Sequence, residues 1–485
     1  MNGLDSSRDA KEPLCNEQVG IVPSPGDEAI LDIPRILPAS TGMGARRRNL
    51  AIFTLLSVAS IIASLWGIAL TYKKTGIILD SRMAYLAGRC LIQHCDPYNE
   101  AAMTRVYLAE GGERVTASSH GGTPHYLAAF HVYLPSAEPF FSLLALLPWR
   151  AAYAIWTALI LALITIASFL AWSMAQSYAP DPPFYLAWLL LVNSGLFIAG
   201  GNPAGIAVSL CVIATWCILE GRFIAVGMVC LAISLAIKPH DCGLIWIYLV
   251  LLGASQHKRA IQSFLVFGVV GVGATVWISN VSPHWVAELR SNLVLLSANG
   301  ECADPAGPAA ISMFNLQTVF AVFNSNSHFY NLATFAVCAV LILIWMFVTV
   351  RAPRSPRGIW LGLATITVVS ILPIYHRSYD AKILLLTLPA CAMLWAEGGL
   401  IGWLALFFTG GSILLTSELT AVFQQTLSPA SEARGEVLHL LIARPAPLIL
   451  SAESVFYLYV YVRHYRSVRQ KEMSANVPDV LQSAR

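Results

Sequence analysis

The chain has 485 residues, of which 56% are hydrophobic and only 12% are charged, and its formal net charge is +3. This composition excludes an ordinary soluble domain, and the small net charge without a basic run gives no support to nucleic-acid binding. The sequence predicts an all-α polytopic membrane protein, because apolar runs close in length to the thickness of a bilayer core recur along it. They lack the alternation of a transmembrane β-strand. These runs cover residues 50–72, 151–171, 261–278, 332–350, 359–374 and 400–415.

Residues 1–48 are polar and rich in Asp, Glu, Ser and Pro, and they lack the charged, apolar and cleavage segments of a secretory signal. We expect a disordered tail here. The arginines at 46–48 stand directly before the first apolar run, so the positive-inside rule places this tail in the cytoplasm. The first span then leads outward. Residues 73–131 become the first extracytoplasmic loop of a transmembrane domain that covers residues 49–463.

The first outer loop contains the stretch TGIILDSRMAYLAGRCLIQHCDPYN, which is half apolar yet carries two carboxylates. Charged groups beside a membrane exit are costly, so they are candidates for a functional site. Asp80 is the first candidate, although a carboxylate at this position can also cap a helix over DSRMAYLAGRCL. Asp96 has a simpler structural explanation, because Asp-Pro opens turns. If this side of the membrane is oxidising, a disulfide among Cys90, Cys95 and Cys302 can form, and the sequence favours no particular pairing.

Residues 130–222 do not divide cleanly into spans. Counting every apolar run of the chain as a span gives about thirteen crossings. Basic residues near both ends, including the tail at residues 464–485, place both termini in the cytoplasm and require an even number. One run of this region, such as PFFSLLALLP or the piece that ends at GGNPAG, is therefore broken, re-entrant or not spanning. We expect about twelve spans, within a range of about 11–13.

Two later outer turns also carry charges. In AISLAIKPHDCGLIW, Pro239 breaks the helix beside Lys238, His240 and Asp241. This turn is either an interface with a snorkelling lysine or a place where a cation holds a phosphate.

The other turn, LPIYHRSYDAKILLL, packs polar groups between two spans. These groups belong to His376, Arg377, Tyr379, Asp380 and Lys382. They form either a hydrated interface anchored by Tyr and Arg or part of a site. If the helices bring the three outer segments together, the segments make a pocket for an anionic ligand with a base at its edge.

The order of these motifs resembles that of the GT-C glycosyltransferases, in particular the polyprenyl-phosphate-mannose-dependent mannosyltransferase-like family, glycosyltransferase family 87. Asp80, Tyr85 and CDPY at residues 95–98 resemble the Asp, Tyr and Gly-Asp-Pro-Tyr element that follows the first span of that family. YLPSAEP resembles its Tyr-Pro-Pro, and GGNPAG resembles its Gly-Gln-x-Asn, with Gly201 in the place of glutamine. The KP of residues 238–239 matches its Lys-Pro turn, and LPIYHRSYD resembles its Ser-Pro-x-x-x-x-His-Tyr.

The resemblance implies a GT-C fold whose active site is formed by the extracytoplasmic loops. It also implies transfer of a sugar, by default mannose, from a polyprenyl-phosphate donor to a hydroxyl of a lipid or glycan acceptor at a bacterial inner membrane. Asp80 takes the place of the general base, and a single base is enough for displacement with inversion. Lys238, His376 and Arg377 are expected to bind the donor phosphate or sugar. The residues expected to support them are Arg82, Tyr85, Asp96, Tyr98, Asn202, His240, Tyr379 and Asp380.

This scheme requires no metal ion and no other cofactor, and the sequence contains no Asp-x-Asp motif. A competing class is a polytopic transporter or flippase for a lipid-linked or anionic substrate, which needs polar groups deep inside its spans. Glu138, Glu220 and Glu453 lie near run ends or in the irregular region, and this favours a site on one side of the membrane. A third class is a scaffold without catalysis, for which removal of the Asp80 carboxylate has no effect.

Overall fold

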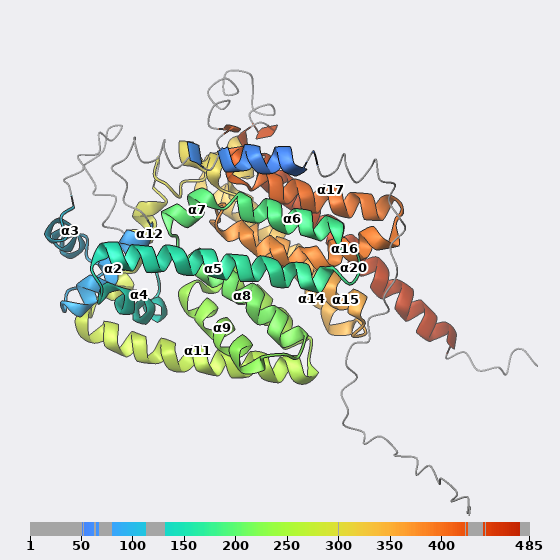
Figure 1. The fold of residues 1–485 in the computed structure, drawn as a ribbon, viewed down its shortest axis with the longest axis horizontal. Coiled ribbons are helices and arrows are strands. Elements are labelled where there is room, and N and C mark those ends of the chain that lie inside the picture. The colour runs from blue at the N-terminus through green and yellow to red at the C-terminus, as the bar shows by residue number, and fades with distance from the viewer. Residues whose placement is uncertain are drawn as a thin grey trace, which may run out of the picture. The chain divides into compact units, whose positions relative to one another are not determined.

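The computed structural model describes residues 51, 53–62, 65–66, 80–112, 131–298, 300–421, 423–424, 440–441 and 443–475, all within one unit over residues 35–485. Every regular element in these residues is a helix (Figure 1). The tail predicted at residues 1–48 and much of the first outer loop lie outside the described residues.

Four helices of the described part are long and apolar enough to cross a membrane. They are α5 (Trp149–Ala175), α11 (Ala254–Val281), α14 (Ser327–Arg351) and α20 (Pro445–Ala475). The 27 residues of α5 extend over about 40 Å, which exceeds the thickness of the hydrocarbon core. Exposed apolar side chains such as Val269 of α11 and Leu332 of α14 suit contact with lipid. Three of these helices coincide with predicted runs, and the fourth, α20, continues beyond residue 463, the predicted end of the transmembrane domain.

The other main helices of the described part are shorter. They are α6 (Asp181–Val192), α8 (Ala204–Leu219), α9 (Ile224–Ile237), α10 (Pro239–Leu251), α15 (Pro356–Ile371), α16 (Leu388–Glu397) and α17 (Gly399–Leu415). In the irregular region, α4 (Glu138–Ala145) and α7 (Gly195–Gly200) are far too short to span a bilayer. The helix breaks at GGNPAG because Gly201 is left-handed, with φ at 65°, and Pro203 stands just before α8. The total number of spans stays a prediction.

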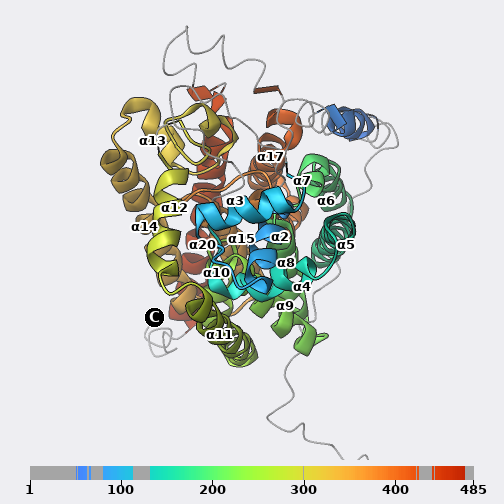
Figure 2. The ribbon, with the colours of Figure 1, turned by 90° about the vertical axis from the view of Figure 1, so that its left-hand side faces the viewer.

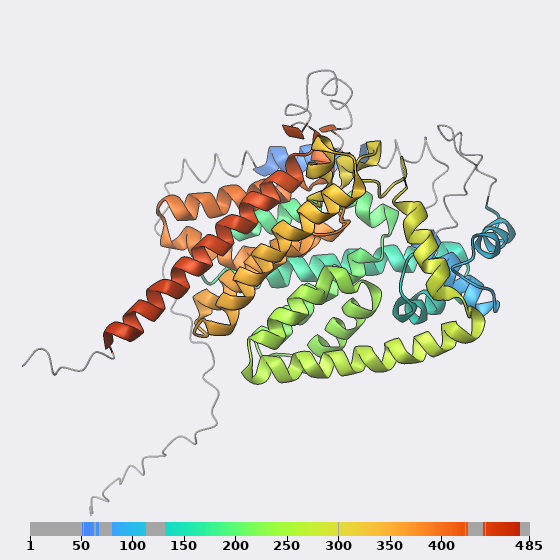
Figure 3. The same ribbon diagram turned by 180° about the vertical axis from the view of Figure 1, so that it is seen from behind.

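Two shorter helices, α8 and α15, form the centre of the packing. Nearly every residue of α8 is buried, and this helix lies against α5, α9 and the 3-10 segment η3 (Asp380–Thr387). Most of α15 is buried as well, and α15 lies beside α14 and α20 (Figure 3). Helices that are apolar on all sides must be enclosed by others. The core therefore fixes the ends of the helices from which the polar turns emerge.

Short helices lie together at one end of the long ones (Figures 1 and 2). They are α2 (Asp80–Ile92), α3 (Glu100–Ala109), α4 and α12 (Trp285–Leu296). Gly88 allows α2 to approach α4 closely, because a Cβ atom at this position would lie 2.5 Å from the carbonyl carbon of Phe141. Asn292 of α12 donates a hydrogen bond to the carbonyl oxygen of Tyr98 at 3.0 Å. These contacts attach the first outer loop to the helix bundle.

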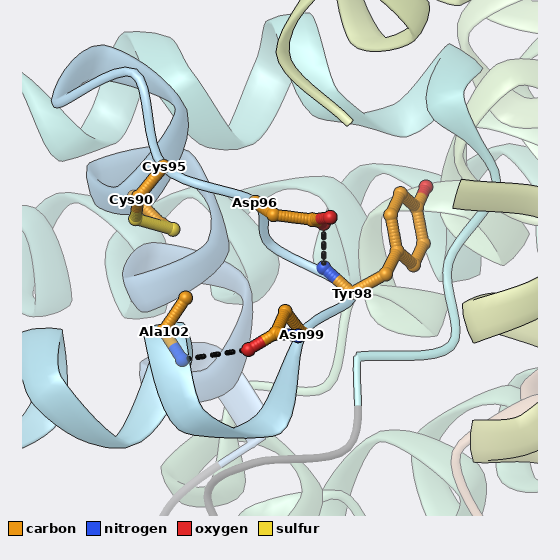
Figure 4. Close-up of a disulfide and its surroundings, with 6 residues drawn as sticks. All are labelled: Cys90, Cys95, Asp96, Tyr98, Asn99 and Ala102. Carbon is orange, nitrogen blue, oxygen red and sulfur yellow. Dashed lines mark hydrogen bonds between the residues drawn. A yellow bond between two sulfur atoms is a disulfide. The ribbon is translucent and has the colours of Figure 1, made fainter. Parts of the chain in front are cut away.

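A disulfide closes the end of α2 (Figure 4). It joins Cys90 to Cys95, and Cys302 is a free thiol, so the structure selects one pairing from those that the sequence leaves open. The turn that follows is held by Asp96, whose Oδ1 accepts from the backbone N–H of Tyr98 at 2.9 Å. Asp96 thus has the turn-forming contact that its Asp-Pro sequence predicts.

Candidate active site

Asp80 opens α2, and a residue from a distant part of the sequence holds its carboxylate. The side-chain amide of Asn202 donates from Nδ2 to Asp80 Oδ2 at 2.8 Å, across 122 residues of sequence. The first turn of a helix also favours a carboxylate, so a structural role and a functional role are compatible. Asp80 is only partly buried and can therefore meet a substrate.

The turn GGNPAG holds Asn202 in place. Asn202 Oδ1 accepts from the backbone N–H of Ala204 at 2.9 Å, and Trp156 Nε1 donates to the carbonyl oxygen of Gly201 at 2.7 Å. A Cβ atom at position 201 would lie 2.7 Å from the Ser81 side chain, and the left-handed backbone there also disfavours a side chain. Glycine therefore suits this turn better than the glutamine of the related motif.

Lys238 joins the second and third polar segments. It lies at the junction of α9 and α10, and only 7% of it is exposed. Its Nζ forms an ion pair with Asp380 Oδ1 and lies 3.5 Å from Asp241 Oδ2, while the ring centre of Tyr379 is 5.0 Å away. Burial lowers the pKa of Lys238, but the charges of Asp241 and Asp380 outweigh it and leave the pKa raised. The lysine therefore remains a cation.

Two histidines face one oxygen of the same carboxylate. Nε2 of His376 lies 3.2 Å from Asp241 Oδ1, and Nε2 of His240 lies 3.3 Å from the same atom. Nδ1 of His376 lies 2.9 Å from the carbonyl oxygen of Ile374. His376 is buried, whereas His240 is exposed. Two separate polar turns thus converge on Asp241.

Arg377 connects the third segment to a loop over residues 300–307. Its guanidinium donates to the carbonyl oxygen of Cys302 at 2.6 Å, and its backbone N–H donates to Asp380 Oδ2 at 2.8 Å. Within the loop, the carboxylate of Asp304 accepts from two backbone N–H groups, at 2.8 and 2.9 Å. Arg377 is therefore fixed from two sides.

Tyr133 is a site residue that the sequence analysis does not single out. Burial raises the pKa of its hydroxyl most, and the charges of Asp80, Asp380 and Asp241 raise the pKa further. Tyr133 therefore lies within electrostatic reach of three carboxylates that are far apart in the sequence. Its backbone oxygen accepts from the Tyr98 hydroxyl at 2.9 Å. In the sequence, the feature that could have indicated this residue is the motif YLPSAEP, of which Tyr133 is the first residue.

Four of the predicted supporting residues have contacts within or near the first outer loop. The guanidinium carbon of Arg82 lies 5.1 Å from the centre of an aromatic ring, and the Tyr85 hydroxyl donates to a backbone carbonyl at 3.0 Å. Asp96 and Tyr98 form the turn that follows α2. These contacts hold the loop together, and a contribution of the four residues to substrate binding stays a prediction.

A partly buried carboxylate, the buried ammonium of Lys238 and the partly buried guanidinium of Arg377 thus lie where apolar helices end. This arrangement is that of a membrane protein with a polar site at the ends of its helices, and enzymes that act on lipid-linked substrates share it. The family model of glycosyltransferase family 87 matches residues 130–374, half of the chain, and the chain belongs to this family. No curated protein and no solved structure matches the chain.

Membership of the family establishes glycosyl transfer as the class of reaction, with a sugar donor and an acceptor as substrates. The matched region includes Asn202, Lys238 and Asp241, whereas Asp80 and His376 lie outside it. The contacts from Asn202 to Asp80 and from Asp241 to His376 therefore connect the matched region to the two flanking segments.

Proposed function

We propose that the protein transfers a sugar, with mannose as the first candidate, from a polyprenyl-phosphate donor to an acceptor hydroxyl on the extracytoplasmic side of the membrane. The position of Tyr133 supports this function most directly. Both the Asp80 carboxylate and the Asp380 carboxylate, which pairs with Lys238, act on its hydroxyl. A candidate base and a candidate cation thus both lie near Tyr133, and this reaction needs both.

Asp80 is the proposed general base. Asn202 holds Oδ2, and Oδ1 takes the proton of the acceptor hydroxyl as that oxygen attacks the anomeric carbon. The bond from the anomeric carbon to the phosphate oxygen breaks in the same step, and the lipid phosphate leaves with the bonding electrons. One carboxylate that acts as a base is enough for this displacement, which inverts the anomeric configuration, whereas a retaining glycosidase uses two carboxylates in paired roles.

Lys238, His376 and Arg377 are the proposed donor-binding groups. Asp380 holds the Lys238 ammonium before any substrate binds, and the Cys302 carbonyl holds Arg377. Cations that are already oriented can stabilise the charge that develops on the leaving phosphate without reorganising. The polyprenyl tail of the donor stays in the lipid beside the exposed apolar faces of the helices.

The proposal includes about twelve spans, a location in the bacterial inner membrane and both termini in the cytoplasm. In support, α14 ends at Arg351 and further arginines lie before or at the start of α15, whereas the polar turn that carries His376 follows the other end of α15. Cysteines introduced at Gly112 and Arg354 test this topology with a membrane-impermeant thiol reagent. We expect labelling at position 112 in intact cells and at position 354 only after permeabilisation; the opposite pattern would reverse the orientation.

Purified protein in detergent, supplied with radiolabelled polyprenyl-phosphate mannose and a membrane-lipid extract, tests the reaction. We expect the parent to consume the donor and Asp80→Asn to lose about 100-fold or more of the turnover while it still binds the donor. Asp181→Asn is the matched control, because Asp181 is an exposed carboxylate in the first turn of a helix, α6, and has no proposed role in the reaction. Equal turnover by Asp80→Asn and the parent would remove Asp80 from the mechanism.

Other polyprenyl-phosphate sugars form parallel arms of this experiment. Turnover with a different sugar would keep the mechanism and replace mannose. Failure of the parent with every such donor, together with passage of a lipid-linked substrate across reconstituted vesicles, would favour the transporter.

A further inference from the structure

His240, Asp241 and His376 form a cluster whose spacing matches that of ligands around a metal ion. One ligand atom from each residue lies within 4.8 Å of the others. Asp241 Oδ1 is 3.3 Å from His240 Nε2 and 3.2 Å from His376 Nε2. Ligand atoms that surround a tetrahedral ion at about 2.0–2.1 Å lie about 3.3–3.4 Å from one another. Two of the three distances between the ligand atoms of this cluster are therefore already close to those around a tetrahedral ion.

The contacts in this cluster are not aligned as hydrogen bonds. Both carboxylate oxygens of Asp241 are buried and have no hydrogen-bond partner within the described part of the chain. A buried carboxylate without such bonds is costly unless a cation compensates it. An ion bound by all three residues holds their ligand atoms close together, and it needs no N–H group of either histidine to point at Asp241 Oδ1. This fits the observed geometry.

The orientation of the His376 ring agrees with this geometry. Its Nδ1 is 2.9 Å from the carbonyl oxygen of Ile374, and a carbonyl can only accept, so Nδ1 carries a proton. Nε2 is therefore the ring nitrogen that is left to bind an ion, and it faces Asp241 Oδ1 at 3.2 Å. The two atoms can therefore bind one cation together. Metal-binding histidines commonly donate their other N–H to a carbonyl in this way.

The charges around the cluster leave room for such an ion. Lys238 forms its ion pair with Asp380, so a second carboxylate neutralises the ammonium. Lys238 Nζ lies 3.5 Å from Asp241 Oδ2, whereas the two histidines face Oδ1 of the same carboxylate. His240 is exposed, so an ion can enter from that side.

We propose that His240, Asp241 and His376 bind one divalent transition-metal ion. Two imidazole nitrogens and one carboxylate oxygen suit Zn²⁺ best, and three protein ligands leave a coordination position open. The role of the ion rests on the proposed function: if that function is correct, a phosphate oxygen of the donor occupies the open position. The ion would then neutralise negative charge on the leaving phosphate.

Metal binding by the full-length protein in detergent tests the site without any sugar donor. The protein is stripped with a chelator, equilibrated separately with Zn²⁺, Co²⁺, Mn²⁺ or Mg²⁺, desalted and analysed by mass spectrometry for bound metal. We expect about one Zn²⁺ per chain in the parent and a loss of about tenfold or more in His376→Asn and His240→Asn. His257→Asn, in α11 and exposed, is the matched control and should bind as the parent does.

Two further measurements address folding and geometry. Zn²⁺ should raise the melting temperature of the parent and of His257→Asn but not of His376→Asn, and this comparison shows that the variant is folded and has lost the site. Co²⁺ in the parent should give the visible absorption of a four-coordinate ion. If the parent retains none of the four ions, the proposal is wrong. If the parent binds Zn²⁺ but turns over no donor, the metal site stands and the proposed function fails.

Discussion

Replacing Asn202 by Asp tests whether this residue orients the proposed base or only begins a helix. Asn202 has two contacts: Nδ2 donates to Asp80 Oδ2 at 2.8 Å, and Oδ1 accepts from the N–H of Ala204 at 2.9 Å. Asn202→Asp keeps an acceptor for Ala204 and replaces the donor to Asp80 by an oxygen. Asn202→Ala removes both contacts. The pair of variants therefore separates the two roles.

The size of the effect follows from the contact with Asp80. A hydrogen bond to a charged group contributes about 1.5–3 kcal/mol, so its loss alone corresponds to about 10–150-fold in rate. Asn202→Asp adds repulsion between two carboxylates, about 4 kcal/mol at about 4 Å in a partly screened site. The Asp80 side chain relieves this repulsion by turning away or by taking up a proton, and either change removes the base. We expect kcat/KM to fall by about 100-fold or more for Asn202→Asp, and by at least as much as for Asn202→Ala.

The assay is turnover of radiolabelled polyprenyl-phosphate mannose, with thermal unfolding in detergent measured in parallel. Asn202→Asp should unfold near the parent temperature because the start of α8 is retained, whereas Asn202→Ala should lose about 1 kcal/mol of stability. The reasoning is refuted if Asn202→Asp retains parental turnover while Asn202→Ala loses it. In that case Asn202 serves the start of α8 and does not orient Asp80.

Gly201→Ala should lower the unfolding free energy by about 1–3 kcal/mol, because its Cβ would lie 2.7 Å from Ser81 on a left-handed backbone; an unchanged melting temperature would contradict the geometry of this turn. Asp304→Ala removes the acceptor for two N–H groups of the loop whose Cys302 carbonyl holds Arg377. Arg377 should become less ordered, so we expect KM for the donor to rise about tenfold while kcat changes less. Equal KM values for the variant and the parent would show that the loop does not position Arg377. Burial lowers the pKa of Lys382 to about 8, so the unfolded chain binds this proton more tightly than the folded protein does. The melting temperature should therefore rise between about pH 8 and pH 10, and Lys382→Met should flatten that rise. An equal rise in both proteins would assign it to another group.

The three polar segments could be found from the sequence because charged side chains beside apolar runs are costly. Asp80, Lys238 and Asp380 each stand in a polar segment beside apolar stretches, so their approximate location followed from the apolar pattern alone. The sequence did not show whether the helices bring the three segments together, and a shared site could be predicted only if they do. The ion pair between Lys238 and Asp380 depends on the packing of α8, α15 and η3, which no local pattern encodes.

Other features of the site depend on geometry that the sequence does not express. Tyr133 is indistinguishable in the sequence from an interfacial anchor, and its place became evident only through the carboxylates around it. His240 and Asp241 are neighbours in the sequence, but His376 follows much later, so no motif search for closely spaced ligands finds the cluster. Arg82 lies two residues after Asp80 on α2, yet it stacks on an aromatic ring.

The long sequence separation inside the ion pair of Lys238 and Asp380 also has a consequence for how the protein is made. The two residues are 142 positions apart, so at about 5–20 residues per second the ribosome needs about 7–30 s to supply Asp380 after Lys238. During this interval Asp241 is the nearby carboxylate that has already been synthesised, and the turn between α9 and α10 must remain near water or near other polar groups. A nascent chain that stops before η3 therefore presents a lysine without its ion pair to Asp380. We expect membrane quality control to recognise such a chain.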